Sequence, residues 1–127
     1  MVIFLDRTFG SKQMAALLRA QGLAVEVLTD HFPPDTPDTE RIPVVATRGW
    51  VIFTQDKNIR NRLLEREAVM ESGARFFMLT NNNRSSDVVA ELLIRVVAKV
   101  EEIAGNNAGP FIAQIQFSGV VRVLDTE

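Results

Sequence analysis

Three aspartates stand at points where the sequence changes from one expected element to the next. Asp6 directly follows the apolar run Val2–Leu5, and Asp56 follows the run Val51–Thr54 after one residue. Asp38 comes after a proline-rich segment, at the expected start of a helix. Because α/β proteins bind ligands at the carboxyl ends of their parallel strands, we expect these three carboxylates to meet at one edge of a sheet.

Carboxylates at such an edge are suited to holding a hard divalent cation. Mg²⁺ and Mn²⁺ prefer oxygen ligands and keep several waters, which leaves positions for a substrate phosphate. Three neighbouring carboxylates repel one another unless a cation or a proton lies between them. The chain has no cysteine, so thiolate metal sites are excluded. The pattern predicts a Mg²⁺ or Mn²⁺ site built from the three aspartates, with Glu40 as a further candidate ligand.

A simpler interpretation gives these acids no chemistry. Aspartate is common at turns, so Asp6 and Asp56 could merely end their strands. Asp38 could act only as a helix cap, which is worth about 0.5–2 kcal/mol by itself. Capping and metal binding can coexist at the same side chain.

Basic and amide side chains follow the same expected strand ends. They are candidates for binding RNA phosphates, although a solvated helix face or a plain turn would explain each of them as well. The candidates are Arg7, Lys57, Asn58, Arg60, Asn81 and Arg84.

The composition is that of one globular domain covering residues 1–127. The chain is 46% hydrophobic and 24% charged, which is too apolar for wholesale disorder. A net charge of −2 argues against nucleic-acid binding by bulk electrostatics. No apolar run approaches the roughly 18 residues that would span a bilayer, so we expect no membrane association. The start MVIFLDRTFG is typical of a strand and not of an export signal, and with no cysteines we expect a cytoplasmic protein.

Strand and helix patterns alternate along most of the chain, which predicts an α/β fold with a mainly parallel sheet. Residues 111–117 and 120–124 flank Ser118-Gly119 and predict a C-terminal β-hairpin or two edge strands. The other expected strands are residues 2–5, 23–28, 51–54 and 75–79, and the expected helices are residues 12–21, 38–48, 57–72 and 87–104.

Two helices carry further detail. In the helix at 57–72, Ile59, Leu63 and Leu64 belong to the expected core-facing stripe, and Gly73 is the expected end. The helix at 87–104 should begin at a Ser85 or Ser86 cap. Its expected apolar stripe contains Val88, Leu92, Val96 and Val100.

The order of short motifs resembles the PIN-like nucleases, in particular the toxin-type group related to VapC. The motifs are Phe4-Leu5-Asp6, residues 17–25 (LLRAQGLAV), Asp38-Thr39-Glu40 and residues 51–57 (VIFTQDK). The resemblance implies a three-layer α/β/α fold and a Mg²⁺-dependent endoribonuclease that cleaves single-stranded RNA with a metal-activated water. It assigns catalysis and metal binding to Asp6, Asp38 and Asp56. It also implies a cognate antitoxin as partner and suggests a homodimer.

Two other functions remain open. A receiver-type phosphoacceptor domain also has acids after its first and third strands, and Thr80 would follow the fourth. It would, however, need an adjacent acid pair after the first strand and a lysine at the end of a fifth, and the chain has neither. The other alternative is a PIN-like module that only binds a partner, because Asn58 stands where some relatives carry a second acid.

Overall fold

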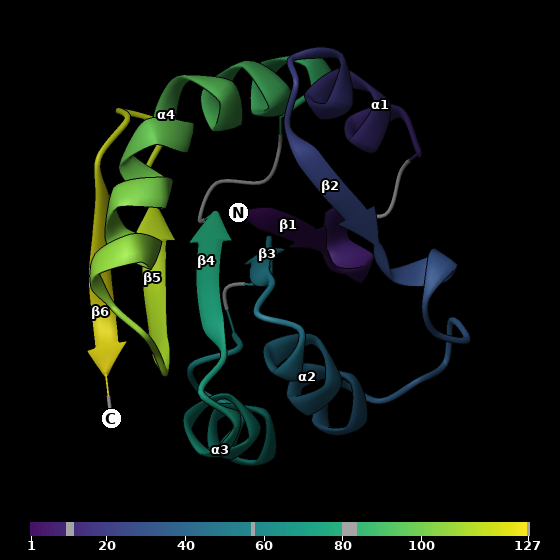
Figure 1. Cartoon of the computed structure of the whole chain (residues 1–127), viewed down its shortest axis with the longest axis vertical. Helices are drawn as coiled ribbons and strands as arrows, with labels where there is room; N and C mark the ends of the chain where they lie inside the picture. The colour runs from purple at the N-terminus through teal and green to yellow at the C-terminus, as the bar shows by residue number, and fades with distance from the viewer. Residues whose placement is uncertain (10–11, 57, 80–83, 127) are drawn as a thin grey trace.

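The computed structural model describes residues 1–9, 12–56, 58–79 and 84–126. Six strands form one sheet, and four α-helices cover its two faces (Figure 1). The strands are β1 (Val2–Leu5), β2 (Ala24–Val27), β3 (Val51–Thr54), β4 (Arg75–Leu79), β5 (Phe111–Ile115) and β6 (Val121–Thr126). The helices are α1 (Lys12–Ala20), α2 (Asp38–Thr47), α3 (Leu63–Ser72) and α4 (Ser86–Asn106).

The sheet has the strand order β2-β1-β3-β4-β5-β6. All neighbours pair in parallel except β5 and β6, which form an antiparallel hairpin at one edge. The predicted mainly parallel sheet and C-terminal hairpin are therefore confirmed. The chain leaves β1 in one direction to reach β2 and then returns to place β3 on the other side of β1, so the order reverses between β1 and β3. Ligands bind at such a reversal in open α/β sheets.

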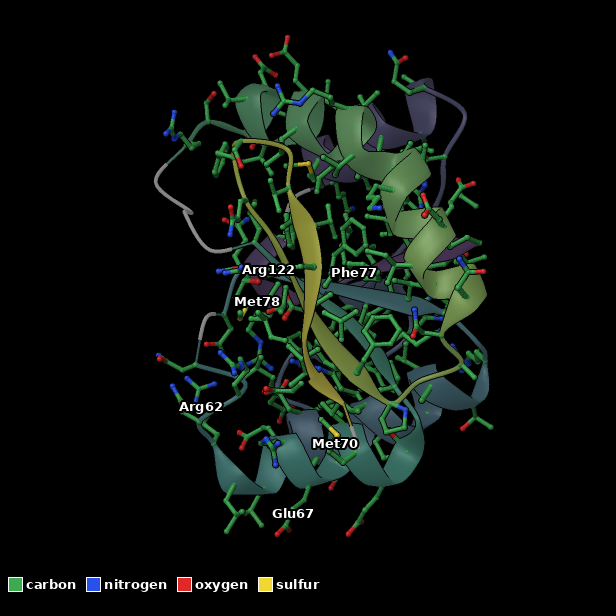
Figure 2. All side chains as sticks on the ribbon, turned by 90° about the vertical axis from the view of Figure 1, so that its left-hand side faces the viewer. Arg62, Glu67, Met70, Phe77, Met78 and Arg122 are labelled. Atoms are coloured by element: carbon green, nitrogen blue, oxygen red, sulfur yellow. The ribbon has the colours of Figure 1, made fainter. Side chains whose placement is uncertain are left out.

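Alternation along the strands divides the core between the two faces of the sheet. Phe77 lies in the core beneath α1 and α4, whereas its neighbour Met78 lies in the core beneath α2 and α3 (Figure 2). Phe4 and Ile52 likewise belong to the α2 and α3 side. The result is the expected three-layer α/β/α arrangement, with the interior of the sheet apolar on both faces.

The helix expected at residues 57–72 begins later than predicted, at Leu63. Asp56 accepts a hydrogen bond from the backbone N–H of Asn58 at 3.0 Å, which closes a turn, and Arg62 is extended at φ −92° and ψ 112°. Leu63 and Leu64 are consequently 69% and 66% exposed, so their placement in a core stripe was wrong. The end of the helix at Gly73, in the left-handed region at φ 75°, is confirmed.

Helix caps differ from one element to the next. In α2 the cap is Pro37, and Asp38 is the first helical residue with its carboxylate turned to Arg41, so capping by Asp38 is wrong. In α4 the predicted cap is confirmed, because Ser85 Oγ accepts a hydrogen bond from Val88 N. Val88 itself is 39% exposed and does not share the core stripe of Val96. Among the described residues, no helix is long and apolar enough to cross a membrane.

Candidate active site

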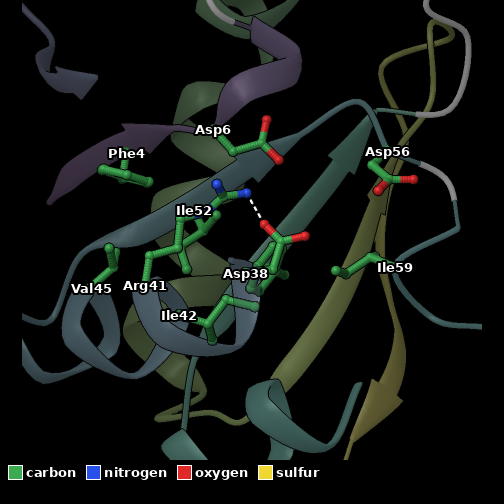
Figure 3. Close-up of a pocket in the computed structure, with 10 residues that line it drawn as sticks. Phe4, Asp6, Asp38, Arg41, Ile42, Val45, Ile52, Asp56 and Ile59 are labelled. Atoms are coloured by element: carbon green, nitrogen blue, oxygen red, sulfur yellow. Dashed lines mark ion pairs between the residues drawn. The ribbon is translucent and has the colours of Figure 1, made fainter. Parts of the chain in front are cut away.

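The three predicted aspartates line one pocket beside the reversal of strand order (Figure 3). Asp6 follows β1, Asp56 follows the neighbouring strand β3, and Asp38 reaches in from the first turn of α2. The pocket is small, with a cavity volume of about 10 Å³. This is room for one water or one ion and not for a nucleotide.

Asp6 is a buried carboxylate held by Thr8. It is 7% exposed, and its Oδ1 accepts hydrogen bonds from the backbone N–H of Thr8 at 2.9 Å and from the Thr8 hydroxyl. Burial raises the pKa of Asp6 above its ordinary value, and hydrogen bonds from Thr54 and Thr8 and the charge of Arg41 act in the opposite direction. The ionised carboxylate is therefore poorly hydrated and has a strong need for a nearby positive charge.

Arg41 supplies one such charge from within α2. Its guanidinium forms an ion pair with Asp38, and its Nη1 donates a hydrogen bond to the backbone oxygen of Thr36 at 3.3 Å. The Arg41 side chain is only 7% exposed. Burial lowers its pKa, and the nearby Asp6 carboxylate opposes that shift. Sequence reasoning missed Arg41, although its i,i+3 spacing from Asp38 and its place beside Ile42 were a readable signal.

Asp56 has a second arginine as its partner. Its Oδ2 forms an ion pair with Arg62, while its Oδ1 accepts the hydrogen bond from Asn58 N. The backbone N–H of Asp56 donates to Thr54 Oγ1 at 3.0 Å, which fixes the direction in which the chain leaves β3. Asp56 is thus positioned by its own loop, and Arg62 is a further residue that the sequence analysis did not single out.

The pocket therefore holds three carboxylates and, on two of them, arginine partners. Within the described residues, no three acidic or histidine side chains are grouped closely enough to hold a metal ion. Glu40 is exposed and does not line the pocket. In this arrangement one oxygen of Asp38 is paired with Arg41, and one oxygen of Asp56 is paired with Arg62.

The remaining predicted residues lie around the site at different places. Arg7 lines a neighbouring cavity of about 350 Å³ that also contains Asp6, and its Nη2 donates to Pro34 O at 2.7 Å. Arg60 forms a two-bond ion pair with Asp125 at 2.8 Å for each bond, and Arg84 lies over the ring of Phe117 at 4.7 Å. Asn58 is exposed in the turn after Asp56, and Lys57 and Asn81 lie outside the described residues.

Comparison with known proteins places this site in a family. Residues 1–81 match the family described as "PIN like domain". The chain belongs to the PIN-like domain family. The matched segment contains all three pocket aspartates and the arginines that pair with Asp38 and Asp56, whereas α4, β5 and β6 lie beyond it.

One relative extends the similarity over nearly the whole chain. A protein of Mycobacterium tuberculosis named "Putative ribonuclease VapC45" is 33% identical over 126 residues, covering 96% of this chain and 91% of the relative. No solved structure matches the chain. The resemblance drawn from the short motifs is confirmed by the family match and by this relative. A PIN-like chain also gives no support to the receiver-type alternative.

Proposed function

We propose that this protein is a metal-dependent endoribonuclease that cleaves single-stranded RNA. The observation that carries the proposal is the convergence of Asp6, Asp38 and Asp56 on one pocket at the reversal of strand order. The family match and the ribonuclease name of the relative support the same activity.

We propose Mg²⁺ as the ion, with Mn²⁺ able to replace it. The donor set fits a hard cation, because it consists of carboxylates and contains no sulfur ligand. The buried Asp6 needs a compensating charge, and Asp38 and Asp56 are the other two side chains that would hold the ion. When bound, the ion would activate water and offset the negative charge that develops on the phosphodiester. Glu40 remains a lower-ranked candidate ligand, because it lies outside the pocket.

The chain's own residues would prepare the site for that chemistry. Thr8 fixes the orientation of Asp6 through two hydrogen bonds. Phe4, Ile52 and Phe76 line the pocket with apolar side chains that belong to the core between the sheet and α2 and α3. The larger cavity next to Asp6, with Arg7 in its wall, is where an RNA strand has room to lie. Lys57, Asn58, Arg60, Asn81 and Arg84 remain proposed contacts to RNA.

We also propose that the protein is a cytoplasmic toxin neutralised by a cognate antitoxin, and that it forms a homodimer. The name of the relative supports the toxin role. Exposed Leu63 and Leu64 on α3 offer apolar surface for a second copy. Sedimentation of the wild type and of a Leu63→Gln, Leu64→Gln double variant would test the dimer, and a monomeric wild type would exclude it.

The direct test of activity is incubation of the purified protein with RNAs that contain single-stranded loops. We expect cleavage with Mg²⁺, none with EDTA, and a loss of at least about 100-fold in Asp6→Asn and Asp56→Asn. Asp35→Asn is the matched control, because Asp35 is an exposed aspartate outside the pocket. Equal cleavage by the wild type and both pocket variants would remove these residues from the mechanism. Calorimetry that shows no binding of Mg²⁺ or Mn²⁺ would favour a PIN-like module that only binds a partner.

A further inference from the structure

Arg41 is the buried cation of the pocket, and its position is unusual for a site that is to hold a metal ion. The guanidinium extends from α2 towards the space between Asp6 and Asp38 and is paired with Asp38 (Figure 3). Apolar side chains of Phe4, Ile42 and Val45 line the same pocket. A charged group in such surroundings persists only when a partner of opposite charge compensates it.

The guanidinium and a divalent ion would compete for the same carboxylate. The cavity has a volume of about 10 Å³, and Arg41 pairs with Oδ1 of Asp38, so the guanidinium and a hydrated ion would compete for this space. Two positive charges held near the same carboxylates also repel each other, and the repulsion is strong where water is scarce. We therefore expect an ion that binds Oδ1 of Asp38 to displace the guanidinium of Arg41.

We propose that Arg41 is an internal counter-cation that occupies the metal site in the ion-free protein and sets the ion concentration at which the site fills. The inference rests on the proposed metal-dependent function. In the ion-free state Arg41 compensates the charge of Asp38, and it offsets the charge of Asp6 only in part. With the ion bound, the guanidinium turns away from Asp38, and Asp38 becomes available as a ligand.

Calorimetric titration of the ion-free protein with Mn²⁺ tests this competition without any measurement of cleavage. Arg41→Gln, which removes the charge, should bind Mn²⁺ at least about tenfold more tightly than the wild type. Arg41→Lys keeps the charge and should stay within about threefold of the wild type. Arg48→Gln is the matched control, because it removes an arginine from the end of the same helix outside the pocket, where Arg48 lies over the ring of Trp50.

Unchanged or weaker Mn²⁺ binding by Arg41→Gln would overturn the inference and leave the proposed nuclease function standing. An equal gain in affinity from Arg48→Gln would also overturn it, because the effect would then be one of net charge. If no variant and no wild-type protein binds Mn²⁺ at millimolar concentrations, the metal-dependent function fails as well. Circular dichroism in EDTA shows which variants are folded.

A second measurement needs no substitution. Titration of the wild type with diamagnetic Mg²⁺ should shift the Arg41 Nε–H resonance as its ion pair with Asp38 opens, while the Arg48 resonance stays within the experimental error. An Arg41 resonance that does not move as the site saturates would overturn the proposal, whatever the variants show.

Discussion

Thr8 is exposed, yet it makes several hydrogen bonds that connect two loops of the site. Its backbone N–H and its hydroxyl both donate to Asp6, and the same hydroxyl accepts a hydrogen bond from the backbone of Gln55 at 2.7 Å. One side chain therefore ties the loop after β1 to the loop after β3. These two loops carry Asp6 and Asp56. We therefore expect the distance between the two carboxylates to depend on the Thr8 hydroxyl.

Replacing Thr8 tests that dependence. Thr8→Val keeps the shape but removes the hydroxyl, so it should lower stability by about 1 kcal/mol and reduce RNA cleavage at least about tenfold. Thr8→Ser retains the hydroxyl and should stay close to the wild type. Chemical denaturation and initial cleavage rates measure the two effects. Full activity in Thr8→Val would show that the hydroxyl does not position Asp6.

We expect the buried carboxylate of Asp6 to lower the free energy of unfolding of the ion-free protein. Burial disfavours the ionised form of its carboxylate and raises its pKa. In EDTA, Asp6→Asn should therefore be more stable than the wild type by about 1 kcal/mol, while its cleavage activity is lost. Thermal unfolding of both proteins without metal measures the difference. A destabilised Asp6→Asn would mean that the charge of Asp6 is already well compensated in the ion-free protein.

At the scale of elements, local sequence was enough to predict the strands and the acids that follow them. Val2–Leu5 and Val51–Thr54 are short apolar runs whose ends are fixed by the next polar residue. The start of α3 was not predictable in this way. It depends on the Asp56 side chain closing a turn and on Arg62 pairing with it, and both are interactions that hydrophobic spacing does not encode. The i,i+3 spacing of Asp38 and Arg41 is local, but the burial of Arg41 in the pocket depends on how α2 is rotated over the sheet, which local spacing does not encode.

Helix α4 contains a matched pair of valines, one on its buried face and one outside it. Val96 is 4% exposed and Val88 is 39% exposed. Val96→Ala should cost about 2 kcal/mol of unfolding free energy, and Val88→Ala about 0.5 kcal/mol or less. Urea denaturation of the two variants measures both values. Equal losses would mean that α4 is rotated relative to the orientation described above.

Arg60 fixes the C-terminal strand to the turn after β3. It holds the carboxylate of Asp125, and the hydrogen bonds from Arg60 lower the pKa of Asp125 below its ordinary value. This ion pair contributes stability above the unfolded pKa of about 3.9, and the contribution is lost as the pH falls through the lowered pKa of the folded state.

Arg60→Gln should therefore destabilise the protein at pH 7, by about 1 kcal/mol or less because Arg60 is partly exposed to solvent. The difference from the wild type should shrink as the pH falls below the unfolded pKa of Asp125 and vanish once Asp125 is protonated in the folded protein as well. Thermal unfolding across this pH range measures it. A difference that persists at the acidic end would show that Arg60 stabilises the protein by packing instead of by its charge.

At the scale of the whole molecule, the site lies where the strand order reverses, between β1 and β3. The family match over residues 1–81 includes β1 to β4 and all three pocket aspartates, and the hairpin of β5 and β6 extends the sheet beyond it. The family resemblance could be predicted from ordered motifs, since each motif is a local feature. The relative placement of the three carboxylates required the strand order, because Asp6 and Asp56 become neighbours only when β3 returns beside β1.

The most direct test of the proposed metal site is the position of a bound ion. Anomalous diffraction from a crystal soaked in Mn²⁺ should show one strong peak within about 2.5 Å of carboxylate oxygens from Asp6, Asp38 and Asp56, with the guanidinium of Arg41 displaced from Asp38. A Mn²⁺ ion bound elsewhere, or a pocket still empty at saturating Mn²⁺ with the Arg41 ion pair intact, would contradict it.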